Sequence, residues 1–212
     1  MKTFVTLSIV ALLLLVSVIS FGDIFSNRSY SNALKGGYKI GEQVTDFNLL
    51  NVDGNYVSLA DYPAAKGFII VFTTNHCPYA KAYEARIANL DKKYKLQGYP
   101  VIAINANSPD IIAENNFTNM KVRAQQKAFT YPYLFDKNQE VCKAFGASKT
   151  PHTYLLCKEN KKLVVKYIGA IDDNYKDAKQ VQQKFLEEAI QALLHGEEIA
   201  IKTTKAIGCS IK

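Results

Sequence analysis

The segment from Phe72 to Tyr79 holds the residue best suited to chemistry, Cys77. An apolar run from Phe68 to Phe72, typical of a buried strand, ends just before it, and an amphipathic helix from about Cys77 to Leu96 begins there. Such junctions are where α/β folds place reactive groups. A thiol in the first turn of a helix faces unpaired backbone N–H groups and the positive end of the helix dipole, which favours the thiolate. We therefore predict that Cys77 is a nucleophile.

Two basic residues flank Cys77 and favour a negative charge on its sulfur. Lys81 follows one helical turn later on the same face, and His76 precedes the cysteine. The alternative is that Cys77 is a small buried hydrophobic residue, as most free cysteines are. The three histidines show no metal-ligand spacing with the cysteines. We expect neither a metal nor an organic cofactor.

The chain has three further cysteines, Cys142, Cys157 and Cys209. Four cysteines allow three complete pairings, and the sequence does not choose among them. Four are also too few to staple a chain of 212 residues, 48% of them hydrophobic, so the core must stabilise the fold. We expect Cys142 and Cys157 to be buried packing residues. Cys209 lies in an apolar tail, where it is either a docked packing residue or a thiol that reaches the active face or a neighbouring subunit.

The N-terminal residues have the pattern of an export signal. Lys2 precedes an apolar run from Phe4 to Ile19, and cleavage is expected after Gly22. An uncleaved membrane anchor through residues 4–19 is the alternative. We assign 1–22 to the signal peptide or anchor, 23–37 to a linker and 38–212 to one folded domain. Export to the periplasm or the medium would let disulfides persist.

The net charge of +7 comes from lysines scattered among acidic residues. Nucleic-acid binding needs a clustered basic surface, which this pattern does not provide, so we expect no nucleic-acid partner.

The remaining elements are predicted from apolar periodicity and from turn residues. Asp53-Gly54 predicts a hairpin turn between the strands 46–50 and 56–59. The strand 68–72, the helix and a strand at 101–104 predict a parallel right-handed crossover. The later predictions are a helical insertion at 110–129, a strand at 133–135, a helix at 138–145, strands at 153–157 and 163–168, and a helix at 176–195.

Four separated motifs follow one another along the chain. They are Asp46-Phe47 with Val57-Ser58-Leu59, Asn75-His76-Cys77-Pro78-Tyr79, Lys149-Thr150-Pro151-His152 and Ile207-Gly208-Cys209-Ser210-Ile211-Lys212. In this order they resemble the thioredoxin fold, and more narrowly the redoxin branch that includes the alkyl hydroperoxide reductase and thiol-specific antioxidant superfamily. The resemblance covers Tyr38 to Lys212. It implies an α/β domain with a central mixed sheet flanked by helices, an N-terminal β-hairpin extension and an inserted helix.

The resemblance also implies a substrate groove. Pro151 is then cis and lies against Cys77, and the backbone of Thr150 pairs with the extended chain of a substrate. The alternative is an ordinary trans turn proline.

One position departs from the close relatives, which carry Cys-x-x-Cys where this chain has Thr74-Asn75-His76-Cys77. Disulfide exchange needs a second thiol, and the motif supplies none. Thr-x-x-Cys instead resembles peroxiredoxins, in which the threonine orients a peroxide and the thiolate attacks it. The peroxiredoxin pattern further has a proline where this chain has Ile70, and an arginine late in the domain, where no arginine follows Arg123. Arg86 or Lys81 would have to substitute for it.

Two functions follow from these residues. The first is an exported antioxidant or redox-homeostasis thiol oxidoreductase with Cys77 as nucleophile, a peroxide or a thiol/disulfide as substrate, a thiol reductant protein as partner and Cys209 as the candidate resolving thiol. The second is a non-catalytic thioredoxin-like domain that binds extended peptides in the Pro151 groove. Thr74 favours the second function; Cys77, His76 and Pro151 favour the first.

Overall fold

The computed structural model describes residues 36–212. The predicted signal peptide or anchor at 1–22 and the linker up to residue 35 lie outside the described residues. Within 36–212, no helix has the length and apolarity to cross a bilayer.

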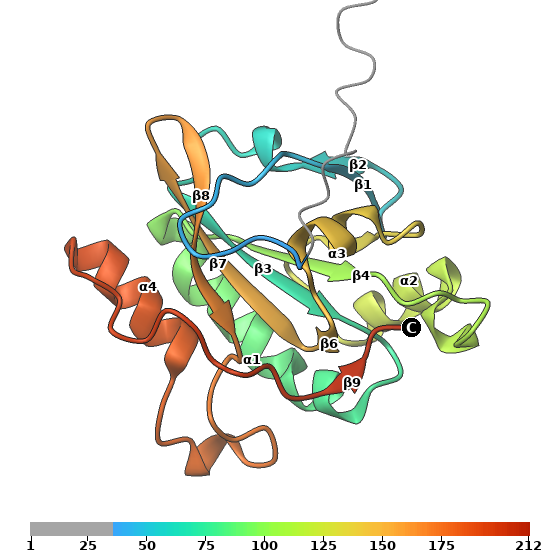
Figure 1. The fold of residues 1–212 in the computed structure, drawn as a ribbon. Helices are drawn as coiled ribbons and strands as arrows, with labels where there is room; N and C mark the ends of the chain where they lie inside the picture. The colour runs from blue at the N-terminus through green and yellow to red at the C-terminus, as the bar shows by residue number, and fades with distance from the viewer. Residues whose placement is uncertain (1–35) are drawn as a thin grey trace, which may run out of the picture. The chain divides into compact units, whose positions relative to one another are not determined.

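The described residues fold around a seven-stranded sheet in the order β2-β1-β5-β4-β3-β7-β8 (Figure 1). The neighbours β3, β4 and β5 are parallel, and the other pairs are antiparallel, so the sheet is mixed. A separate two-stranded sheet pairs β6 with β9. The strands are β1 (Asn48–Asn51), β2 (Tyr56–Ser58), β3 (Gly67–Thr73), β4 (Val101–Asn105), β5 (Tyr133–Phe135), β6 (Lys149–Thr150), β7 (His152–Glu159), β8 (Lys162–Gly169) and β9 (Cys209–Ser210).

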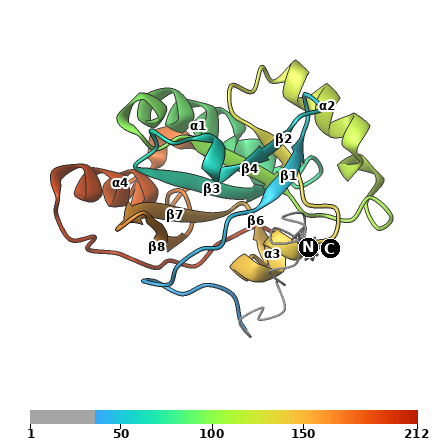
Figure 2. The same cartoon turned by 90° about the horizontal axis from the view of Figure 1, so that it is seen from above.

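Helices cover both faces of the large sheet (Figure 2). Alternate residues of β3 point into two hydrophobic clusters: Ile69 and Val71 pack with α1 and α4, and Ile70 and Phe72 pack with α3. Burial on both faces explains why β3 and β4 are continuous apolar runs. The helices are α1 (Pro78–Tyr94), α2 (Phe117–Gln126), α3 (Glu140–Phe145) and α4 (Phe185–His195), with short 3₁₀ turns at Leu59–Asp61, Lys95–Gln97, Ala113–Asn115 and Ala178–Gln180.

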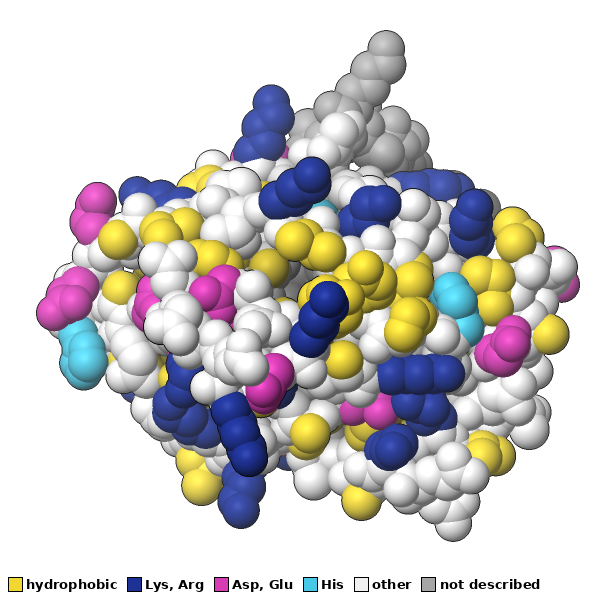
Figure 3. Space-filling model, turned by 90° about the horizontal axis from the view of Figure 1, so that it is seen from below, with side chains coloured by type: hydrophobic (Ala, Val, Ile, Leu, Met, Phe, Trp, Pro, Cys, Tyr) yellow, Lys and Arg dark blue, Asp and Glu magenta, His cyan; other side chains and the backbone are white. Residues whose placement is uncertain are grey.

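This architecture confirms the predicted thioredoxin-like α/β fold, with its opening hairpin and its helical insertion. Glycines in left-handed conformations end the segments as expected, with Gly98 at φ +96° after the 3₁₀ turn that extends α1. On the face shown in Figure 3, lysine and arginine side chains lie at several separate places among acidic ones.

The last helix begins later than predicted, at Phe185 and not at residue 176. The segment before it is a loop held by side chains, because Asn174 Oδ1 accepts the backbone N–H groups of Lys176 and Asp177. Arg86 of α1 also binds the Asn174 carbonyl oxygen, at 2.6 Å. These contacts outweigh the helical periodicity of the local sequence, and Val181 therefore lies outside α4.

Candidate functional site

Cys77 lies at the junction between β3 and α1, where its thiol was predicted. It is the residue that precedes the first turn of α1, and Pro78 occupies the first helical position, which its fixed φ angle suits. No acidic residue lies in the first turn of α1, and no side chain caps the N-terminus of this helix. The helix dipole therefore acts on Cys77 without a competing carboxylate on this turn. Cys77 has no exposed surface.

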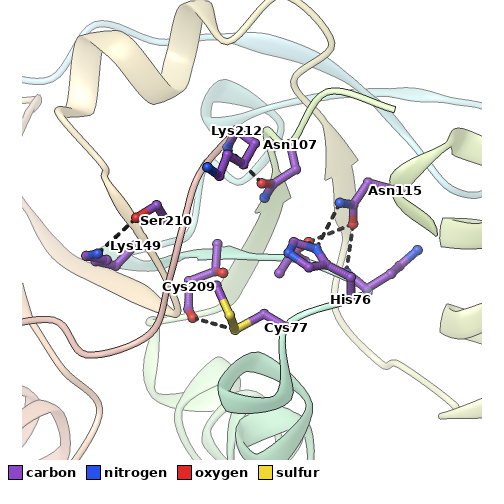
Figure 4. The surroundings of a disulfide bond; sticks show 11 residues. His76, Cys77, Asn107, Asn115, Lys149, Cys209, Ser210 and Lys212 are labelled. Atoms are coloured by element: carbon purple, nitrogen blue, oxygen red, sulfur yellow. Dashed lines mark hydrogen bonds between the residues drawn. A yellow bond between two sulfur atoms is a disulfide. The ribbon is translucent and has the colours of Figure 1, made fainter. Parts of the chain in front are cut away.

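The C-terminal tail covers Cys77 and forms a disulfide with it. Cys77 and Cys209 are bonded, with their Cα atoms 5.9 Å apart, and are separated by 132 positions in sequence (Figure 4). Gly208 allows this approach, because a Cβ atom at that position would lie 2.0 Å from the carbonyl oxygen of Thr150. The tail therefore docks on the body of the domain, and it does so at the position of Cys77.

The tail pairs with the segment that precedes Pro151. In the antiparallel pair of β6 with β9, Thr150 lies opposite Cys209 and Lys149 opposite Ser210. The peptide bond between Thr150 and Pro151 is cis, the form implied by the resemblance. The carbonyl oxygen of Thr150 lies 3.3 Å from the Sγ atom of Cys77. The backbone edge that the resemblance assigns to a substrate is thus occupied by this chain's own tail.

The side chains of Thr74 and His76 contact each other, and no hydrogen bond to the sulfur of Cys77 is found for either of them among the described residues. Thr74 Oγ1 donates to Asn115 Oδ1 at 2.6 Å and lies 2.8 Å from His76 Nδ1. Asn115 Oδ1 also accepts the backbone N–H of Asn75, and Asn115 Nδ2 lies 3.0 Å from His76 Nδ1.

Asn115 contacts Thr74, Asn75 and His76, and it was not among the residues predicted from the sequence. It is fully buried in the 3₁₀ turn before α2 and lies 40 residues from Asn75. Its only sequence signal is a position in a polar insertion rich in asparagine, which is typical of an exposed loop. The burial of the Asn115 side chain and its hydrogen bonds to distant residues follow from the fold and not from the local sequence.

The basic residues proposed as supports for the thiolate lie in different settings. Lys81 is exposed, and its backbone N–H donates to the carbonyl oxygen of Cys77 at 3.0 Å, as the first bond of the helix. Arg86 forms an ion pair with Asp172, at 2.6 Å, and Arg123 pairs with Glu84. Both arginines are thus committed to carboxylates.

The two remaining cysteines are free thiols in different environments. Cys142 is buried in α3, as predicted, and burial together with the nearby Asp136 carboxylate raises its pKa to about 12. Cys157 is partly exposed, which corrects the prediction that it is buried, because β7 extends past the hydrophobic cluster at that point. Its Sγ atom lies 3.6 Å from the Tyr99 hydroxyl oxygen. Within residues 36–212, no cluster of three or more histidine, cysteine or acidic side chains is arranged to hold a metal ion.

A model of the AhpC/TSA family matches residues 40–184, most of the chain. The chain belongs to the AhpC/TSA family. It is therefore a member of the thioredoxin-like redoxin superfamily, as its motifs indicated.

Individual known proteins are similar to this chain over most of their own length. The thiol-disulfide oxidoreductase ResA of Halalkalibacterium halodurans is 25% identical over 167 residues, which are 79% of this chain and 82% of that protein. The crystal structure of an uncharacterized conserved protein from Geobacillus kaustophilus has 35% identity and a TM-score of 0.76, over 82% of this chain and 92% of that one. A thiol:disulfide interchange protein DsbE from Chlorobium tepidum, at 22% identity and a TM-score of 0.55, covers 74% of this chain and 99% of its own and shows the shared fold alone.

Proposed function

We propose that this AhpC/TSA family member is an exported thiol-disulfide oxidoreductase whose redox centre is the pair Cys77 and Cys209. The observation that supports this most is the disulfide between the two residues beside the cis Pro151 bond. It supplies the second thiol that the motif around Thr74 lacks. The ResA relative, named for the same chemistry, adds support.

The reaction begins from the reduced protein. The Cys77 thiolate attacks a protein disulfide, a bond forms between Cys77 Sγ and one substrate sulfur, and the other substrate sulfur leaves as a thiolate that takes a proton from water. Cys209 then attacks the Cys77 sulfur and expels the second substrate sulfur. Two electrons pass to the substrate, and the Cys77–Cys209 disulfide forms. A dithiol reductant protein restores both thiols by the same exchange in reverse.

Peroxide is the less well supported substrate. The Thr74 hydroxyl, which would have to orient a peroxide, donates to Asn115 and contacts His76. The arginines that would stabilise the leaving oxygen are paired with Asp172 and Glu84. Thiol exchange needs neither group, since Cys77 and Cys209 suffice for it.

Export is part of this proposal because a protein disulfide is a persistent substrate only in an oxidising compartment. The apolar run from Phe4 to Ile19 supports export, either by a cleaved signal or by an anchor.

The test follows insulin reduction and hydrogen peroxide consumption by the full chain, with dithiothreitol as reductant. Cys77→Ser is expected to lower insulin reduction by at least about 100-fold, because the attacking thiolate is lost. Cys209→Ser is expected to slow turnover and to accumulate a mixed disulfide on Cys77, identified by peptide mass spectrometry. Cys157→Ser is the matched control, since it removes a partly exposed thiol away from the site, and should stay within about twofold of the parent.

The outcomes separate the candidate functions. Peroxide turnover without insulin reduction would replace exchange by a peroxidase activity. Failure of both reactions, with extended peptides bound equally by the parent and by Cys77→Ser, would leave the non-catalytic peptide-binding function.

A further inference from the structure

The tail is held to the domain by bonds that continue beyond Cys209. The Ile211 N–H donates to the Ser148 carbonyl oxygen at 3.2 Å, and Lys149 Nζ donates to the Ser210 hydroxyl at 3.0 Å. Together with the pairing of β6 and β9, these bonds bind an extended backbone along residues 148–150.

A second set of contacts holds the main chain of Lys212 (Figure 4). Its N–H donates to Asn107 Oδ1 at 3.0 Å, and its oxygen accepts the Ser108 N–H at 2.8 Å. The same oxygen accepts Gln139 Nε2, also at 2.8 Å. Asn107, Ser108 and Gln139 thus grip both sides of one tail residue, and we name these three residues the tail clamp.

The tail clamp is built into the fold. Asn107 is only 1% exposed just after β4, and its backbone N–H is bonded to Asn105 Oδ1. Gln139 precedes α3 with φ +59°, a left-handed conformation unusual for glutamine, and its Nε2 also donates to the Ala106 carbonyl oxygen at 2.8 Å. Both N–H bonds of this amide are therefore used, one on the domain and one on the tail.

None of these bonds includes a sulfur atom. They therefore do not depend chemically on the Cys77–Cys209 disulfide, and the segment they hold includes Cys209, which is bonded to the fully buried Cys77. We propose that residues 148–150 and the tail clamp form a peptide-binding site whose resident ligand is the tail, residues 207–212, and that this site keeps the tail over Cys77 in both redox states. A protein substrate then reaches Cys77 only when the tail leaves.

This inference rests on the proposed function. In that function, the capture of the substrate and its release place opposite requirements on how tightly the tail is bound. Attack on a protein disulfide needs the tail away from Cys77, so a tighter site lowers the fraction of molecules that can react. Release of the substrate needs Cys209 back beside Cys77, so a tighter site raises the effective concentration of the resolving thiol. A weaker tail clamp should therefore speed the first step and slow the second.

The experiment compares Gln139→Ala with its exposed neighbour, Asn138→Ala. Alanine keeps the left-handed backbone of residue 139 and removes the amide with its two hydrogen bonds, to Lys212 and to Ala106, so the comparison tests the contribution of this amide to the tail clamp. In the Cys209→Ser background, the rate of mixed-disulfide formation between Cys77 and insulin is expected to rise about three- to tenfold in Gln139→Ala. With Cys209 present, release of insulin from that mixed disulfide should slow by a similar factor, about three- to tenfold. Asn138→Ala should change neither rate.

A chain ending at Ala206 provides an independent measurement of the first step. It lacks the tail and should capture insulin at least as fast as the Gln139→Ala variant. Capture at the parent rate by both would overturn the inference and leave the proposed function intact. Absence of capture in every variant, the shortened chain included, would instead count against Cys77 as the nucleophile. A general loss of folding would also expose Cys77, so urea unfolding of Gln139→Ala with the parent's midpoint is the control that assigns the opposed changes to the tail.

Discussion

Cys77 and Cys142 are both buried cysteines at the start of a helix, yet their surroundings are opposite. Cys77 precedes α1, a helix of 17 residues with no acidic residue in its first turn. Cys142 is the third residue of α3, a helix of six residues, and its backbone N–H donates to the Asp136 carboxylate at 2.7 Å. At α3, a carboxylate already occupies the position where a thiolate would gain from the helix N-terminus.

The comparison shows that a helix start does not by itself make a cysteine reactive. Burial is the larger cause that raises the pKa of Cys142 to about 12, and Asp136 adds to it. Cys77 is equally buried, but it has a partner sulfur, an uncapped longer helix and the main chain of the tail around it. What distinguishes the reactive site is the absence of a capping carboxylate on α1 together with a second thiol held in place.

The largest expected difference is in alkylation of the reduced protein. At pH 7, iodoacetamide should modify Cys77 of the reduced chain ending at Ala206, which lacks the covering tail, at least about 1000-fold faster than Cys142, because a thiol with a pKa of about 12 is almost entirely protonated. Peptide mass spectrometry at timed intervals measures both rates in one sample. In urea the two rates should converge, which would assign the difference to the fold. Alkylation rates of Cys77 and Cys142 within tenfold of each other in the native protein would mean that their surroundings do not make the two thiols differ in reactivity.

The same environment of Cys142 predicts a loss of stability in alkali. Its pKa is raised from 9.0 in the unfolded chain to about 12 in the fold, so its contribution is complete below pH 9 and is lost as the pH rises from 9 to 12. At pH 10 the expected loss is about 1 kcal/mol. Urea unfolding of the oxidised protein at pH 8, 9 and 10 measures it.

Cys142→Ala is the control for that measurement. Its free energy of unfolding is lower at every pH because of the cavity, but its decline between pH 9 and 10 should be shallower by about 1 kcal/mol. Parallel curves for the two proteins would mean that the Cys142 thiol ionises in the fold as easily as in the unfolded chain.

Local pattern predicted the strand and helix that carry Cys77, because apolar runs and terminal glycines act over neighbouring residues. The features that the local pattern did not predict depend on contacts between residues far apart in the sequence. The start of α4 depends on Arg86, 99 residues before Phe185, and Asn115 reaches Asn75 through the fold. The partner of Cys77 was left open because four cysteines have three pairings, and only the docking of the tail selects Cys209.

The smallest expected effect tests whether charge at the start of α1 contributes to the reactivity of Cys77. Lys81→Glu places an acidic residue on the first turn, as Asp136 is placed at α3, and should slow alkylation of reduced Cys77 by about threefold at low salt. Since Lys81 is exposed, the effect should vanish near about 1 M salt, where surface charges are screened. Lys92→Glu, an equal change of charge near the far end of α1, should leave the rate unaltered. Equal rates for Lys81→Glu and the parent at low salt would mean that the uncapped backbone of α1, and not its flanking charge, favours the thiolate. The contrast with Cys142 would then rest on burial and on the Asp136 cap alone.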